Sequence, residues 1–103
     1  MKVVMTAFAG QQIRQIARYI GKEFSKKYRK EFLNKIKETR QLLAANPNLG
    51  LAEPLLSDYP KTYRSLVVTR LNKMIYYIDG STIFIVDFWD VRREPSTLAN
   101  QVK

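Results

Sequence analysis

The sequence contains neither cysteine nor histidine. Without cysteine, no disulfide and no thiolate metal site can hold the fold together. Without histidine, the chain lacks the usual acid–base group for neutral pH and the commonest metal ligand. A glycine-rich phosphate loop, a nucleophile motif and an EF-hand are absent as well. We therefore expect neither a cofactor nor a metal site.

Long apolar runs are also absent. No run approaches the roughly 20 residues that span a bilayer, and the N-terminus lacks the apolar core of a signal peptide. These absences predict a cytoplasmic protein without a membrane partner.

Acidic residues are scarce. The 103 residues include 18 Lys/Arg and 9 Asp/Glu, a net charge of +9. Residues 1–52 hold 11 basic and 3 acidic residues, whereas residues 53–103 hold 7 and 6. Such a charge implies an acidic partner, such as nucleic acid, a ribosome or an acidic protein. The simpler alternative is a soluble protein with lysine-rich helix surfaces.

Two amphipathic helices are predicted in the first half. The first opens at Gly10 and carries an apolar stripe of Ile13, Ile16, Ala17, Ile20 and Phe24. The second follows Ser25, a favourable N-cap, and ends near Ala45 before Asn46-Pro47-Asn48. The short connection predicts an antiparallel helical hairpin. Arg14, Arg18 and Lys22 recur at a spacing of four, and we interpret them as a solvated face.

Strands are predicted at residues 2–7, 63–69, 73–79 and 82–89, with Gly80-Ser81 as a tight turn between the last two. The length predicts one domain over residues 1–103. The order β-α-α-β-β-β predicts an α+β fold, in which an antiparallel sheet carries the N-terminal helical hairpin on one face.

The stretch IFIVDFWDVRREP at residues 83–95 begins with the apolar, β-branched and aromatic composition of a strand inside a sheet and then changes abruptly to charge before Pro95. Strict alternation predicts that Phe84, Val86 and Phe88 face the helices, and that Ile83, Ile85, Asp87 and Trp89 face the other way. In the preceding strand, Met74, Tyr76 and Ile78 should face the core. We expect both Tyr76 and Trp89 to be packing residues rather than platforms for bases.

These segments resemble a known family. The helical hairpin ending in NPNLG, followed by YRSLVV, KMIYYI and TIFIVDFWDVRREP, is similar to the RelE/ParE superfamily of type II toxin–antitoxin toxins. The resemblance covers nearly the whole chain. It implies a small basic toxin that is neutralised by a cognate antitoxin. It also implies one of two activities. The toxin would either cleave ribosome-bound mRNA as an endonuclease or act on DNA gyrase.

Three departures from the family pattern bear on the target. Asp90 stands where many relatives have His, and Pro95-Ser96-Thr97 follow the arginine pair where the mRNA-cleaving branch often has Tyr. Asn72-Lys73 replaces a frequent Tyr-Arg. The Arg-Arg-Glu-Pro ending is more similar to the gyrase-directed, plasmid-stabilisation branch, which we slightly prefer.

The candidate site residues are Arg64, Lys73, Arg92 and Arg93, which would stabilise a phosphate or bind the target if strand pairing brings them together. For RNA cleavage, proton transfer would have to come from Asp87, Tyr77 or Lys73, whose ordinary pKa values suit neutral pH poorly. Arg92 and Arg93 have an alternative interpretation as local partners of Asp90 and Glu94. The alternative for the whole chain is a non-toxic basic module that binds nucleic acid or has a structural role.

Overall fold

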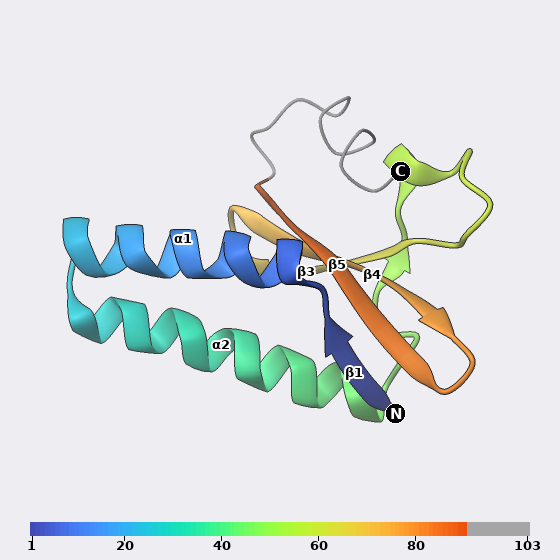
Figure 1. Ribbon diagram of the computed structural model, residues 1–103, viewed down its shortest axis with the longest axis horizontal. Helices are drawn as coiled ribbons and strands as arrows, with labels where there is room; N and C mark the ends of the chain where they lie inside the picture. Colours follow the sequence, from blue (N-terminus) through green and yellow to red (C-terminus); the bar gives the residue numbers. More distant parts are fainter. Residues whose placement is uncertain (91–103) are drawn as a thin grey trace.

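The computed structural model describes residues 1–90 (Figure 1). Its elements are β1 (Lys2–Met5), α1 (Ala7–Glu23), α2 (Lys26–Ala45), β2 (Leu51–Ala52), the 3-10 turn η1 (Pro54–Leu56), β3 (Arg64–Thr69), β4 (Asn72–Asp79) and β5 (Thr82–Asp90). The strands form one five-stranded sheet in the order β1-β5-β4-β3-β2, with the helical hairpin on one face. The predicted α+β class is confirmed, and the short strand β2 is an addition.

The sheet is mixed rather than wholly antiparallel. Strand β1 pairs in parallel with β5, with Lys2 opposite Thr82 and Met5 opposite Ile85. The other neighbouring pairs are antiparallel. An apolar strand pattern carries no direction, and nearly the whole chain separates β1 from β5. The sequence therefore could not show whether β1 runs parallel or antiparallel to β5. A parallel pair needs only a long connection between its strands, and the chain has one.

Side-chain caps fix where the helices begin. Helix α1 starts at Ala7, three residues before the predicted Gly10, because the Thr6 hydroxyl accepts from the Ala9 N–H at 3.2 Å. Helix α2 begins after Ser25 as predicted, where the Ser25 hydroxyl accepts from the Tyr28 N–H at 3.1 Å. Such caps satisfy N–H groups that have no partner in the first turn.

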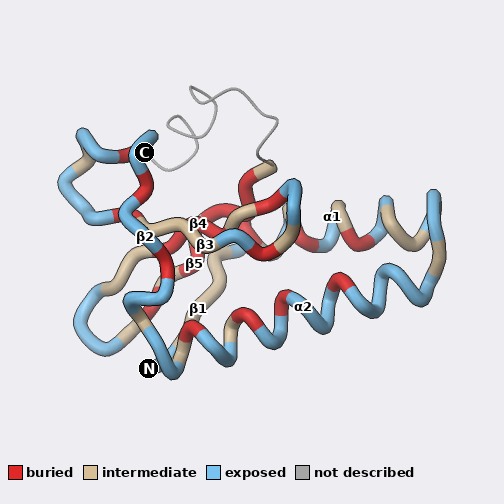
Figure 2. Tube along the Cα trace, turned by 180° about the vertical axis from the view of Figure 1, so that it is seen from behind, coloured by how far each residue is buried: buried red, intermediate tan, exposed pale blue. Residues whose placement is uncertain are grey.

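The buried residues form two clusters, one on each face of the sheet. Figure 2 marks buried positions along the strands and along both helices. The helix-side cluster joins both helices to the sheet and comprises Ala9, Ile13, Ala17, Phe32, Ile36, Leu43, Val68, Met74, Tyr76, Ile83, Ile85 and Phe88. The opposite-face cluster comprises Leu56, Tyr63, Ile75 and Trp89, with Tyr59, Tyr77 and Val86 against it. The packing roles predicted for Tyr76 and Trp89 are confirmed, since both are buried.

A β-bulge interrupts the alternation of β5. Ile75 of β4 lies opposite Asp87, but the next residue, Tyr76, lies opposite Ile85, so Val86 is an extra residue in β5. The backbone N–H of Phe88, just past this point, donates to the Gln12 side chain of α1 at 2.9 Å. This hydrogen bond helps to fix α1 against the sheet.

The bulge explains where the predicted faces fail. The strict alternation was wrong for four residues, Ile83, Phe84, Ile85 and Val86. The two isoleucines pack in the helix-side cluster, whereas Phe84 stacks on Tyr77 and Val86 packs against the opposite-face cluster. Phe88 and Trp89, which follow the extra residue, lie on the predicted faces.

Within residues 1–90, neither helix combines the length and apolar character needed to cross a membrane.

Candidate functional site

Lys73 lies near the start of β4 and forms an ion pair with Glu53. Its ammonium donates to both carboxylate oxygens of Glu53 at 2.8 Å. The Glu53 side chain is 1% exposed and that of Lys73 is 18% exposed. Trp89 lies beside Lys73 on the neighbouring strand. The charge of Lys73 is therefore already neutralised, inside the opposite face of the sheet.

Glu53 is a site residue that sequence reasoning missed. It precedes η1, and its backbone N–H donates to the Tyr63 carbonyl at 2.8 Å, which fixes the loop against β3. Burial raises the pKa of Glu53, but hydrogen bonds from Lys73 and Ser65 and the charge of Lys73 together bring it below the ordinary 4.5. The available signal was an acid standing alone in the apolar run LGLAEPLL.

Arg64 opens β3 on the helix side of the sheet. One guanidinium nitrogen donates to the Gly50 carbonyl at 2.7 Å. Its neighbour Tyr76 donates its hydroxyl to the Pro47 carbonyl at 2.8 Å and accepts from the Gly50 N–H at 2.9 Å. Burial raises the pKa of Tyr76 above 10.0, although the Gly50 N–H and the charge of Arg64 act in the other direction. These bonds attach the chain after α2 to the sheet.

The structure does not bring Arg64 and Lys73 together. Arg64 lies opposite Tyr76 and Lys73 lies opposite Val67, so the two cations are at opposite ends of the β3–β4 pair. They also project from opposite faces, because Tyr76 and Lys73 are three residues apart in a regular stretch of strand. The expectation that strand pairing gathers both cations is wrong. Antiparallel pairing places the start of one strand beside the end of the next.

Two of the three groups considered for proton transfer, Asp87 and Lys73, are enclosed or held by another residue, whereas Tyr77 is half-buried. Asp87 is fully buried, and Lys73 is held by Glu53. The Tyr77 ring stacks on Phe84 with 5.2 Å between centroids, and the Lys61 ammonium lies 4.2 Å above the Tyr77 ring.

Arg92 and Arg93 lie outside the described residues. The last described residue, Asp90, is paired with Asn72, so the described chain ends one position from Lys73. At the far end of β3, Arg64 and Lys61 line a polar hollow of about 330 Å³. Among residues 1–90, no three acidic side chains gather as a metal site would require.

Comparisons with known proteins agree with this architecture. The sequence matches the family model described as ParE toxin of type II toxin–antitoxin system, parDE, over residues 3–95. The fold is similar to a chain of the chromosomal ParDE TA system from P. aeruginosa, with a TM-score of 0.73 and 20% identity over 89% of this chain and 97% of that chain. It is also similar to the YoeB dimer from Staphylococcus aureus, with a TM-score of 0.58 and 20% identity over 85% and 93%. No curated protein gives a significant match.

Proposed function

Because the chain belongs to the ParE toxin family of type II toxin–antitoxin systems, we propose that it arrests growth by acting on DNA gyrase rather than by cleaving mRNA. The observation that carries this choice is the state of the candidate acid–base groups. Asp87 is buried, Lys73 is ion-paired with Glu53, and the sequence has no histidine. Cleavage of RNA needs a group that accepts and a group that donates a proton at the phosphate.

We further propose that Arg92 and Arg93 contact the acidic surface of the target, and that Arg64, the first residue of β3, adds positive charge. In this proposal Lys73 acts indirectly, because its ammonium is held by the buried Glu53. Guanidinium groups suit carboxylates and phosphates alike, since each can donate two parallel hydrogen bonds.

The proposed partner that neutralises the toxin is a cognate antitoxin, and the proposed compartment is the cytoplasm. The charge of +9 favours an antitoxin with an acidic segment that orders on binding. A short reading frame beside this gene that encodes such a chain would support the pairing. Mixing the two purified proteins in a calorimeter measures it, and an absence of both heat and co-elution contradicts it.

The decisive experiment induces the protein alone in a bacterial host and follows growth, DNA supercoiling and message integrity. We expect growth arrest, altered supercoiling and a DNA-damage response, with messages intact. Cleaved messages on stalled ribosomes would overturn the choice of gyrase.

Substituting the arginine pair tests the proposed contact. Arg92→Ala/Arg93→Ala should abolish growth arrest while leaving the fold intact, as judged by circular dichroism. Lys35→Ala/Lys37→Ala is the matched control, because it removes the same charge from the exposed side of α2 and should remain toxic. Full toxicity of the folded arginine variant would eliminate the pair as a target contact.

A further inference from the structure

The helical hairpin extends past the sheet, and its free end is strongly basic. We define the hairpin tip as residues 18–30, where α1 passes into α2. In Figures 1 and 2 the tip lies away from every strand. It holds six Lys/Arg residues and one acid, Glu23. All six cations are exposed.

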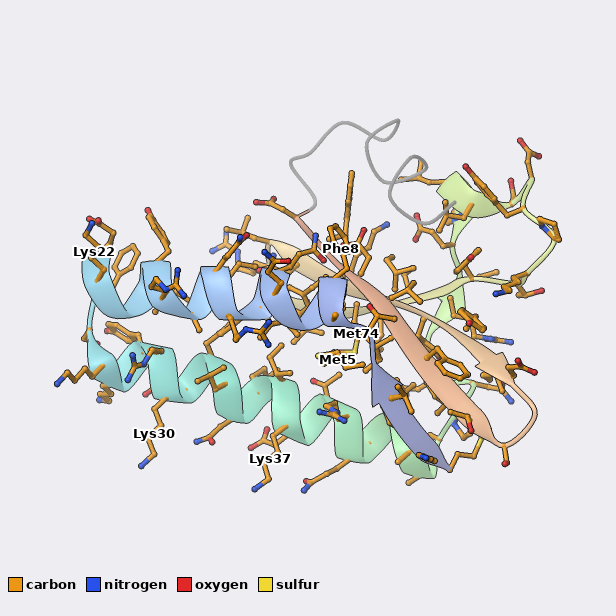
Figure 3. All side chains as sticks on the ribbon, in the orientation of Figure 1. Met5, Phe8, Lys22, Lys30, Lys37 and Met74 are labelled. Carbon is orange, nitrogen blue, oxygen red and sulfur yellow. The ribbon has the colours of Figure 1, made fainter. Side chains whose placement is uncertain are left out.

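These cations are available to a ligand. Among residues 1–90 the only ion pair joins Lys73 to Glu53, so no carboxylate in that part of the chain pairs with the tip. Figure 3 shows Lys22 at the end of α1 and Lys30 pointing away from α1 on the outer side of α2. A Cβ on Gly21 would lie 3.1 Å from the Arg29 side chain, so this glycine lets Arg29 pack against α1. The charges of both helices therefore gather at one end.

Three aromatic side chains stand among these charges. Tyr19, Phe24 and Tyr28 are 59%, 65% and 56% exposed. The Tyr19 and Phe24 rings meet edge to face, with 6.1 Å between centroids. Tyr28 lies one turn before the buried Phe32, so it continues the apolar stripe of α2 beyond the sheet. The rings are exposed because the sheet ends before it can cover them.

A groove runs beside these rings. It has a volume of about 500 Å³ and an apolar lining of Ile16, Tyr19 and Ile20 of α1, Phe24 just past its end, and Leu71 of the β3–β4 turn. Gln15, Asn72 and Asp90 add polar atoms to its wall. This volume falls within the range of about 300–1,000 Å³ that is typical of small-ligand sites. A flat, apolar group can enter here while its attached anion remains among the lysines.

A second group of aromatic rings in the described chain differs from the tip, because its rings are covered. On the opposite face of the sheet, Phe84 stacks on Tyr77, and Tyr77 meets Tyr63 edge to face. Lys61 covers the remaining face of Tyr77. Those rings contact one another, whereas the rings of the tip are open to solvent.

We propose that the hairpin tip binds single-stranded nucleic acid, with its lysines and arginines on the phosphates and its aromatic rings against unpaired bases. Cations alone suit any polyanion, but exposed rings beside an apolar groove favour a chain that carries planar groups. An acidic peptide would match the charge without using the rings in this way. The proposal replaces the solvated face inferred for Arg18 and Lys22, and it does not depend on the identity of the toxin's target.

Fluorescence anisotropy tests the proposal by measuring how tightly the purified full chain binds a labelled oligothymidylate of about 15 nucleotides and a labelled duplex of equal length. We expect the single strand to bind more tightly than the duplex. Phe24→Leu keeps the apolar character but removes the ring, and it should weaken single-strand binding by about 5- to 150-fold. Val67→Ser, at an exposed apolar position on β3, is the control and should bind normally.

A salt series separates the charge contribution. Lys22→Gln/Lys26→Gln should reduce the slope of log K against log salt by about 1.4, since each phosphate contact on a single strand contributes about 0.7. Lys35→Gln/Lys37→Gln removes equal charge about two turns further along α2 and should leave the slope unchanged. Circular dichroism confirms the fold of each variant.

Three outcomes would overturn the proposal. The first is duplex binding at least as tight as single-strand binding. The second is unchanged oligonucleotide binding by folded Phe24→Leu. The third is ring-dependent binding of polyglutamate or of phosphatidylglycerol vesicles without binding of the oligonucleotide, which would assign the tip to an acidic protein or to a membrane surface.

Discussion

Substituting Lys73 by methionine tests whether this residue acts through the fold or on the target. Methionine keeps the unbranched stem and removes the charge, which leaves the Glu53 carboxylate buried without its cation. Breaking such a pair costs about 3–5 kcal/mol when both groups are enclosed. Lys73 is 18% exposed, so water can reach the vacated end, and we expect a loss of about 3 kcal/mol.

The double variant Lys73→Met/Glu53→Gln provides the matched comparison. Glutamine removes the buried charge but keeps hydrogen-bonding atoms for the partners of Glu53. The double variant should therefore be more stable than Lys73→Met by at least half of the loss, about 1.5 kcal/mol, so the losses of the two single variants should sum to more than the loss of the double variant. Urea unfolding at pH 7 of the parent, Lys73→Met, Glu53→Gln and the double variant measures these differences. The dependence of the unfolding free energy on urea concentration should have the same slope in all four.

The pH dependence of stability provides a second, independent test of the ion pair. In the parent protein the pKa of Glu53 lies below 4.5, so its contribution to stability is full above about pH 4.5 and is lost as the pH falls through the lower folded value. In Lys73→Met, burial still raises the Glu53 pKa and is opposed only by the hydrogen bonds from Ser65 and the Leu55 backbone, so we expect the folded state to bind the proton more tightly than it does in the parent protein. The loss of stability of Lys73→Met relative to the parent should therefore become smaller as the pH falls from 7 to 4.

Two results would refute this reasoning. Losses of the two single variants that simply add up to the loss of the double variant would show that the pair has no coupling. A double variant that folds normally but is no longer toxic would show that Lys73 contacts the target directly, since the fold no longer needs its charge.

Three further predictions concern stability in urea. Phe88→Ala should lose about 3–5 kcal/mol, because Phe88 is fully enclosed and meets the Phe32 ring edge to face; a loss under 1 kcal/mol would contradict its placement. Gly50→Ala should lose about 1–3 kcal/mol, because its Cβ would lie 2.7 Å from the Ser65 carbonyl oxygen; parent-like stability would show that the loop moves freely. Ser25→Ala should lose about 1 kcal/mol with its cap, whereas Ser25→Asp should keep most of it.

Local patterns predicted most of the fold. The apolar stripe and the Ser25 cap located α2, and alternation located β3, β4 and β5 to within one residue. The start of α1 was misplaced because Thr6, a capping residue before Ala7, was assigned to the preceding strand. These signals lie within a few residues of the element that they specify.

Features that depend on contacts between distant parts of the chain could not be predicted from local patterns. The bulge at Val86 depends on how β5 pairs with β4, and no residue type within β5 indicates it. The Lys73–Glu53 pair joins residues 20 positions apart through a loop with little regular structure. Arg64 and Lys73 both looked available because charge in a sequence does not indicate which face or which end of a strand it occupies.

The packing of β5 on both faces of the sheet also determines how the molecule unfolds. This single strand supplies Ile83, Ile85 and Phe88 to the helix-side cluster and Val86 and Trp89 to the opposite-face cluster. Neither cluster can melt while β5 keeps its place in the other. The two faces should therefore lose their structure in one cooperative step, with equal calorimetric and van't Hoff enthalpies.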